Sequence, residues 1–145
     1  MIALGSDHGG FELKEEIKKY LEEKGYEVKD FGCYTPESVD YPDIAYPVAK
    51  EVAAGTYEKA ILCCGTGIGI SLAANKVKGI RAAACSDTFS AEMMRRHNDA
   101  NILCLGGRVV GIGLALKMVD LFLETEFEGG RHQRRVDKIM EIENL

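Results

Sequence analysis

Features of specialised protein classes are missing from this chain of 145 residues. No apolar stretch is long enough to cross a bilayer, so we expect no membrane-spanning segment and no membrane partner. The first five residues have no basic flank and are typical of a strand rather than a signal peptide, which predicts a cytoplasmic protein. No internal repeat, linker or low-complexity stretch is present, and the length suits one domain over residues 1–145.

Positive charge is also scarce. The chain has 18 lysines and arginines against 23 aspartates and glutamates, which gives a net charge of −5. An acidic chain is repelled by nucleic-acid phosphates, so we expect no nucleic-acid partner. Basic residues nevertheless gather near the C-terminus, where they form either a solvated helix face or a local anion site. They are Arg131, His132, Arg134, Arg135 and Lys138.

The five cysteines do not form a metal-ligand pattern. Their number is odd and no export signal precedes them, which indicates free thiols. No C-x-x-C pair and no cysteine–histidine pair with ligand spacing occurs, so we expect no metal site. Cys85 and Cys104 lie inside strand-like runs, where a free cysteine packs as a small apolar residue.

Short apolar runs alternate with amphipathic segments along the whole chain. This pattern predicts a three-layer α/β/α, Rossmann-like domain with a five-stranded parallel sheet covered on both faces. The last amphipathic segment has only a narrow apolar stripe, which suits a helix packed on a partner subunit. We predict strands at 2–5, 26–31, 59–63, 80–85 and 102–105, and helices at 11–24, 43–54, 70–77, 113–124 and 131–142. A further helix, which Ser86-Asp87 can cap, is predicted to run to about His97.

Ligands of such sheets bind at the carboxyl ends of the strands. Polar and glycine-rich residues follow four of the five predicted strands, which supports a site at this edge more strongly than any single motif. These residues are Ser6 to His8, Cys64 to Ser71, Ser86-Asp87 and Gly106 to Arg108.

The segment from Cys64 to Ser71 is the most informative of these. Its glycines allow the backbone to approach an anion, and the start of a helix supplies unpaired N–H groups. The spacing Gly65-x-Gly67-x-Gly69 fits neither the dinucleotide fingerprint nor a P-loop, so a small oxyanion is favoured over a pyrophosphate. A turn without a ligand is the alternative. Cys64 is then either a buried strand-end residue or a thiolate that acts as base or nucleophile.

Three other side chains have both a functional and a structural interpretation. His97 can shuttle a proton or end a helix. His8 follows the first strand and can bind a ligand or stabilise a turn. Arg108 follows Gly106-Gly107 and can bind a phosphate with both guanidinium nitrogens, or it can be an ordinary surface arginine.

Several short motifs, found in the same order over nearly the whole chain, together resemble the ribose-5-phosphate isomerase B family. They are Gly5-Ser6-Asp7-His8-Gly9-Gly10, Asp40-Tyr41-Pro42, Cys64-Gly65-Thr66-Gly67-Ile68-Gly69, Ala73-Ala74-Asn75-Lys76, His97-Asn98, Gly107-Arg108 and Gly129-Gly130-Arg131-His132-Gln133-Arg134-Arg135.

The resemblance implies interconversion of ribose 5-phosphate and ribulose 5-phosphate through a cis-enediolate, without metal or organic cofactor. Some family members use a glutamate in the glycine loop as the base, but the matching residue here is Ile70, which leaves Cys64 for this role. The resemblance also implies that Thr66 and His97 open the sugar ring, and that an oxyanion is stabilised by the backbone amides of Gly65, Gly67, Ile68, Gly69 and Ser71. It implies that the sugar hydroxyls are bound by Asp7, Tyr41 and Asn98. The implied phosphate ligands are His8, Arg108, Arg131 and Arg135.

In that family the last two arginines come from a neighbouring subunit, so the resemblance implies a homodimer with a shared site, or a tetramer. Six-carbon sugar phosphates, such as allose 6-phosphate and galactose 6-phosphate, are alternative substrates of the same family. A phosphate- or nucleotide-sensing module without catalysis is a further alternative, and it would need the glycine loop but neither Cys64 nor His97.

Overall fold

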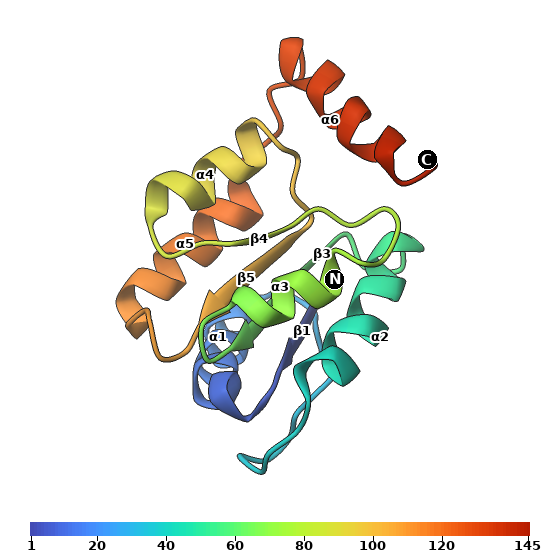
Figure 1. The fold of residues 1–145 in the computed structure, drawn as a ribbon. Coiled ribbons are helices and arrows are strands. Elements are labelled where there is room, and N and C mark those ends of the chain that lie inside the picture. Colours follow the sequence, from blue (N-terminus) through green and yellow to red (C-terminus); the bar gives the residue numbers. More distant parts are fainter.

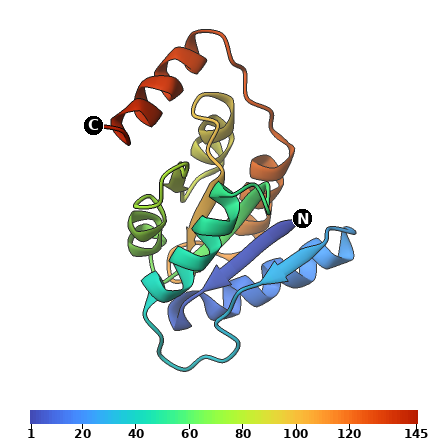
Figure 2. The ribbon, with the colours of Figure 1, turned by 90° about the vertical axis from the view of Figure 1, so that its right-hand side faces the viewer.

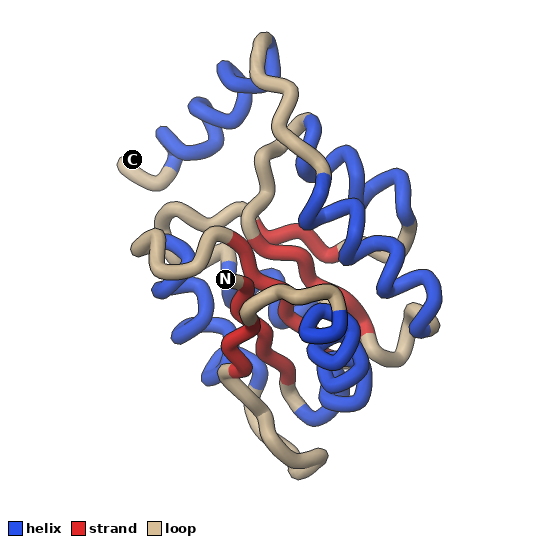
Figure 3. The backbone as a smooth tube through the Cα atoms, turned by 180° about the vertical axis from the view of Figure 1, so that it is seen from behind, coloured by secondary structure: helices blue, strands red, loops and turns tan.

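The computed structural model describes all residues from 1 to 145 and contains one five-stranded parallel sheet with the order β2-β1-β3-β5-β4. Figure 1 and Figure 3 show the sheet at the centre of the molecule with helices on both sides. The two edge strands, which each have one neighbour, are three residues long and shorter than the predicted segments. The strands are β1 (Ile2–Ser6), β2 (Val28–Asp30), β3 (Lys59–Cys64), β4 (Ala82–Ala84) and β5 (Ile102–Gly106).

Helices cover both faces of the sheet, which confirms the predicted three-layer arrangement (Figure 1). One core contains the apolar faces of α1 (Phe11–Glu23), α4 (Thr88–Arg96) and α5 (Ile112–Glu124). The other core contains those of α2 (Tyr41–Ala53) and α3 (Ile68–Ala74). Two details were not predicted: a 3₁₀ turn, η1 (His8–Gly10), precedes α1, and α2 begins at Tyr41 because Pro42 fits the first turn of a helix.

The C-terminal helix α6 (Arg131–Ile142) belongs to neither layer. Figure 2 shows it set apart from the rest of the chain, at the end of an extended connection. Val136 is buried against the chain itself, whereas Ile139 and Ile142 are 46% and 65% exposed. The narrow apolar stripe of α6 therefore includes exposed residues, which lie nearer the end of the helix than Val136, and packing of this helix on a partner stays a prediction. No helix of the chain combines the length and apolarity that a membrane span requires.

A buried ion pair ties α1 to β2 and to the loop that follows. The side chain of Lys14 is fully buried, and its ammonium donates to both carboxylate oxygens of Asp30 at 2.9 and 2.8 Å. The same ammonium donates to the carbonyl of Cys33. Asp30 also accepts a hydrogen bond from the N–H of Gly32 at 2.8 Å, so the pair holds the start of the segment that joins β2 to α2.

We expect Asp30→Ala to lower the free energy of unfolding by about 3 kcal/mol, because it leaves the buried Lys14 ammonium with only the partly exposed carboxylate of Glu15, at 3.1 Å, as a counterion. Replacing both partners, with Lys14→Met added, should recover part of the loss. Urea unfolding of the two variants measures both effects. Lys18→Ala is the control, since Lys18 approaches Asp30 only at 3.5 Å from a partly exposed position. A loss for Asp30→Ala no larger than that of the control would contradict the prediction.

Candidate active site

Cys64 is the last residue of the central strand β3, and its side chain lies under the glycine loop. The residue is 4% exposed, and the N–H of Gly67 donates a hydrogen bond to its Sγ at 3.1 Å. Cys64 is therefore held in one orientation at the carboxyl edge of the sheet.

The loop keeps this shape because it packs on the end of the neighbouring strand β5. Gly67 has φ of +81°, and a β-carbon there would come within 2.9 Å of the carbonyl carbon of Leu105. Both the left-handed conformation and the close approach require glycine. On the other side, the N–H of Gly107 donates to the carbonyl of Cys64 at 2.8 Å. Strands β3 and β5 thus fix the loop together.

The N–H groups of the loop fall into two sets, and only one is free to bind a ligand. Gly67 donates to Cys64, Ile68 donates to the hydroxyl of Thr66 at 3.2 Å, and Ser71 donates to the carbonyl of Gly67 at 3.3 Å. The residues whose N–H groups donate no hydrogen bond within the chain are Gly65, Thr66, Gly69 and Ile70. Of the amides expected to stabilise an oxyanion, those of Gly65 and Gly69 are available, and those of Gly67, Ile68 and Ser71 are engaged.

The two adjacent cysteines lie on opposite faces of the sheet, because successive side chains of a strand alternate between its faces. Cys63 is buried in the core formed with α1, α4 and α5, whereas Cys64 faces the core formed with α2 and α3. Burial strongly raises the pKa of the Cys63 thiol, and the neighbouring Cys64 raises it further. Cys63 is therefore a protonated core residue, and it cannot be the base.

Asp7 and His8 extend the site along the end of β1. The Oδ1 atom of Asp7 accepts hydrogen bonds from Gly9 and Gly10 at 2.9 and 3.2 Å, while its Oδ2 makes no hydrogen bond within the chain. The Nδ1 atom of His8 accepts a hydrogen bond from the N–H of Val39 at 3.3 Å. This contact places the ring proton on Nε2, so a neutral His8 can donate it to a ligand.

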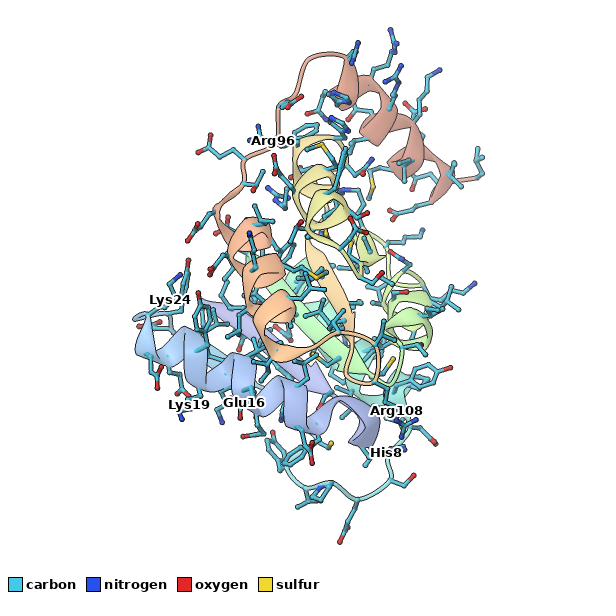
Figure 4. The ribbon with its side chains drawn as sticks, turned by 90° about the vertical axis from the view of Figure 1, so that its left-hand side faces the viewer. His8, Glu16, Lys19, Lys24, Arg96 and Arg108 are labelled. Atoms are coloured by element: carbon cyan, nitrogen blue, oxygen red, sulfur yellow. The ribbon has the colours of Figure 1, made fainter.

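Arg108 lies beside His8 at the same edge of the sheet, as Figure 4 shows. Its guanidinium group passes close to the glycine loop, since a β-carbon at Gly65 would come within 3.3 Å of Nη1. A pocket of about 250 Å³ is lined by His8, Gly9, Pro36, Gly107 and Arg108, among other residues. An imidazole donor, a guanidinium group and loop glycines around a small pocket suit a phosphate group.

Tyr41, at the start of α2, covers the opposite side of the glycine loop. Its ring lies so close to Gly69 that a β-carbon on that residue would meet the hydroxyl oxygen at 3.0 Å and a ring carbon at 2.7 Å. Any larger residue at position 69 would displace the tyrosine. The phenol is 38% exposed, so its hydroxyl remains accessible to a ligand.

The remaining four predicted site residues lie at the other end of the molecule. Helix α4 runs from the carboxyl edge of the sheet back to its amino edge, so His97, at its C-terminal end, and Asn98 lie where β5 begins. Figure 4 shows this separation: His8 and Arg108 are at one end, and Arg96, next to His97, is at the other. Arg131 and Arg135 are exposed on α6 at that same far end. Within one chain, His97 and Cys64 do not form one site.

Glu128 and His132 form a cluster with His97 that the sequence did not predict. The rings of His97 and His132 are stacked, with centroids 4.3 Å apart and planes 12° apart. The Nε2 atom of His132 lies 3.5 Å from a carboxylate oxygen of Glu128. Ligand-type atoms of all three residues lie within 4.8 Å of one another, a grouping that could also hold a metal ion. No spacing rule connects positions 97, 128 and 132, so only the fold reveals this cluster.

Comparison with known proteins agrees with this architecture. The sequence profile of a family described as "Ribose/Galactose Isomerase" matches residues 2–139. Ribose-5-phosphate isomerase B of Escherichia coli (strain K12) is 54% identical over 142 residues, which cover 98% of this chain and 95% of the relative.

Solved structures show the same fold over the full length of the chain. The structure of Clostridium thermocellum ribose-5-phosphate isomerase B is 59% identical with a TM-score of 0.97, and the match covers 99% of this chain and 97% of the other. The Mycoplasma genitalium ribose-5-phosphate isomerase B with bound ribulose-5-phosphate is 45% identical with a TM-score of 0.95, covering 99% and 95%. The chain therefore belongs to the ribose/galactose isomerase family.

Proposed function

We propose that this enzyme interconverts D-ribose 5-phosphate and D-ribulose 5-phosphate through a cis-enediolate, with Cys64 as the base. The observation that carries the proposal is the thiol of Cys64 at the end of the central strand, with unpaired backbone N–H groups of the glycine loop close to it in sequence and fold. The ribulose-5-phosphate bound by the Mycoplasma genitalium relative supports the choice of a five-carbon sugar phosphate.

Phosphate binding places the sugar in the site. His8 and Arg108 line the pocket at the carboxyl edge, and we assign the phosphate to them. The glycine loop is then left for the other end of the substrate, where the reaction occurs. Asp7, with its free Oδ2, and Tyr41 lie on the two sides of the loop and are assigned to sugar hydroxyls.

The proton transfer follows from this placement. The Cys64 thiolate removes the proton from C2 of the open-chain aldose, and the electron pair of the C–H bond forms the C1–C2 double bond while O1 gains negative charge. The proton of the C2 hydroxyl moves to O1 within the cis-enediolate, which leaves the negative charge on O2. The thiol then returns its proton to C1, the electrons of the C1–C2 double bond form the new C–H bond, and O2 becomes the ketone oxygen. The free N–H groups of the loop, among them Gly65 and Gly69, are assigned to the developing oxyanion.

Ring opening requires a second set of groups, because ribose 5-phosphate is a furanose in solution. One group must remove the proton from the anomeric hydroxyl and another must supply a proton to the ring oxygen. We assign these transfers to Thr66 and His97. Thr66 is exposed beside Cys64, but His97 lies at the far end of the same chain, so it must come from another subunit.

A homodimer resolves this separation. The far-end cluster of one protomer would supply His97, Asn98, Arg131 and Arg135 to the carboxyl edge of its partner. Arg131 and Arg135 are one helical turn apart and share a face of α6, so both can reach one phosphate. The exposed Ile139 and Ile142 of the same helix provide an apolar contact for the partner. A tetramer would repeat this arrangement.

We expect the purified protein to isomerise ribose 5-phosphate faster than allose 6-phosphate or galactose 6-phosphate. We also expect EDTA to leave the rate unchanged, because no step assigned above uses a metal ion. A coupled assay with the three substrates, with and without the chelator, measures both. Activity on none of them would overturn the isomerase assignment, and loss of activity with EDTA would overturn the metal-free mechanism.

A further inference from the structure

We infer that His132 is a positioning residue for ring opening: its stacked ring holds His97 in the orientation in which it transfers a proton. This inference rests on the proposed function and adds to it a residue with no assigned role. The stack joins the second residue of α6 to the C-terminal end of α4, two elements that are far apart in sequence.

The first support is the geometry of the two rings. His97 lies at the end of a helix, where its backbone is held only by one N–H bond to Met93 at 2.8 Å, and its side chain makes no hydrogen bond within the chain. The face-to-face contact with His132, at 4.3 Å between centroids, is therefore the interaction that fixes the plane of the His97 ring. Its edge, with both nitrogens, remains free for a substrate.

The second support is that His132 is itself held in place. Its ring is buried, and Glu128 approaches its Nε2 at 3.5 Å. Glu128 is in turn tied to the end of α4, because its N–H donates to the carbonyl of Arg96 at 3.0 Å. Burial, together with the nearby His97 and Arg131, lowers the pKa of His132, although Glu128 opposes this. A neutral ring adds no positive charge next to His97.

The third support is the place of His132 beside the proposed phosphate ligands. Arg131 precedes it and Arg135 follows one turn later on the same helix. The His97 ring that the stack orients therefore lies next to the helix that carries both arginines. The N–H of Glu128 and the carbonyl of Arg96 also join the segment before α6 to the end of α4, so the arginines do not depend on the stack for their position.

The test compares substrates that do and do not need ring opening. D-Erythrose 4-phosphate carries its phosphate on O4, the atom that closes the furanose of ribose 5-phosphate, so it has no such ring to open. We expect His132→Ala to reduce kcat/KM for ribose 5-phosphate by about 10-fold to 100-fold, within the usual contribution of a proton-transfer group, and to leave erythrose 4-phosphate within about twofold of the unmodified enzyme.

Two further variants make the result specific. His132→Phe keeps a flat ring and should restore ribose 5-phosphate turnover to within about threefold of the unmodified enzyme, because stacking rather than a ring nitrogen is required. Gln133→Ala is the matched control on α6, since the one hydrogen bond of this exposed side chain is to Asp137 on the same helix, at 2.8 Å. A second reaction without ring opening is the exchange of the C1 proton of ribulose 5-phosphate with solvent deuterium, because it starts from an open-chain ketose. We expect His132→Ala to retain this exchange.

The inference is overturned if His132→Ala turns over ribose 5-phosphate normally. It is also overturned if both substrates, and the proton exchange, decline equally, because that result would indicate lost phosphate binding or lost assembly. Light scattering on each variant identifies a change in oligomeric state. Failure of the unmodified enzyme to isomerise ribose 5-phosphate would instead overturn the proposed function, so the two failures are distinguishable.

Discussion

Replacing Cys64 by alanine should lower kcat for ribose 5-phosphate by about 10²–10⁴-fold, the usual contribution of a catalytic base. The substitution removes the only acid–base group of the chain that lies under the glycine loop, and Ile70 cannot replace it. KM should change little, because His8 and Arg108 remain in place to bind the phosphate. Steady-state kinetics together with direct titration of ribose 5-phosphate separate these two effects.

The adjacent thiol provides a matched control. Cys63 is equally buried and belongs to the same strand, but it faces the opposite core, so Cys63→Ala should keep normal kcat. Similar kinetics in the two variants would contradict the assignment of Cys64 as base. Binding of the sugar phosphate by Cys64→Ala, with turnover lost, also separates an isomerase from a phosphate-sensing module, whose function would not depend on the thiol.

Mixing two inactive variants should restore about a quarter of the normal activity if the site is shared between subunits. The first variant is Cys64→Ala, which damages the carboxyl-edge half of the site. The second is the double variant Arg131→Ala, Arg135→Ala, which damages the α6 half. Loss of two charge-assisted phosphate contacts should lower its kcat/KM by on the order of 10²–10⁴-fold.

The expected recovery follows from the geometry of a two-fold dimer. Random reassociation makes about half of the dimers mixed, and each mixed dimer contains one site with both halves intact and one with both halves damaged. The two halves lie at opposite ends of the chain, so no single subunit could supply an intact site by itself (Figure 4).

A second pair of variants is the control for any recovery of activity that does not come from a shared site. Cys64→Ala mixed with Thr66→Ala damages the same half in both subunits, so no intact site can form and no recovery is expected. Differently tagged chains that purify together show that subunits have exchanged. Exchange without recovery in the first pair would contradict a shared site, and so would a monomeric native enzyme with full activity.

The layers of the fold follow from local patterns in the sequence, whereas the strand order β2-β1-β3-β5-β4 was not predicted. Apolar runs of strand length and amphipathic segments of helix length predict both layers, and Asp87 caps α4 as expected, accepting a hydrogen bond from Ser90 at 2.7 Å. Boundaries at the sheet edges were less accurate. The edge strand β2 is limited to Val28–Asp30, although the residues on either side of it also bond to β1: the N–H of Ile2 donates to the carbonyl of Glu27 at 2.9 Å, and the N–H of Phe31 donates to the carbonyl of Leu4 at 2.8 Å.

The candidate site was predicted only in part, because two of its properties depend on packing. The sequence places Cys64 beside a glycine loop, but only the packed loop determines which amides are free, and that of Ser71 is not. The residue types near position 97 indicate a proton-transfer group. Because α4 runs away from the carboxyl edge of the sheet, His97 at its end lies far from Cys64 of the same chain. The contact between His97 and His132 has no local signal at all.

The position of Cys64 on the central strand has a consequence for how the enzyme loses function. Strand β3 is paired on both sides and fully buried, so its opening requires unfolding of the whole sheet. Helix α6 follows an extended connection (Figure 2) and is held to its own chain by few contacts, among them the N–H of Gly79 donating to Glu143 at 2.9 Å, so in a separated subunit it can detach at a smaller free-energy cost. Partial denaturation would therefore remove the arginines of α6 and the support of His97 first. The thiol would stay in its native setting inside a folded but inactive protein.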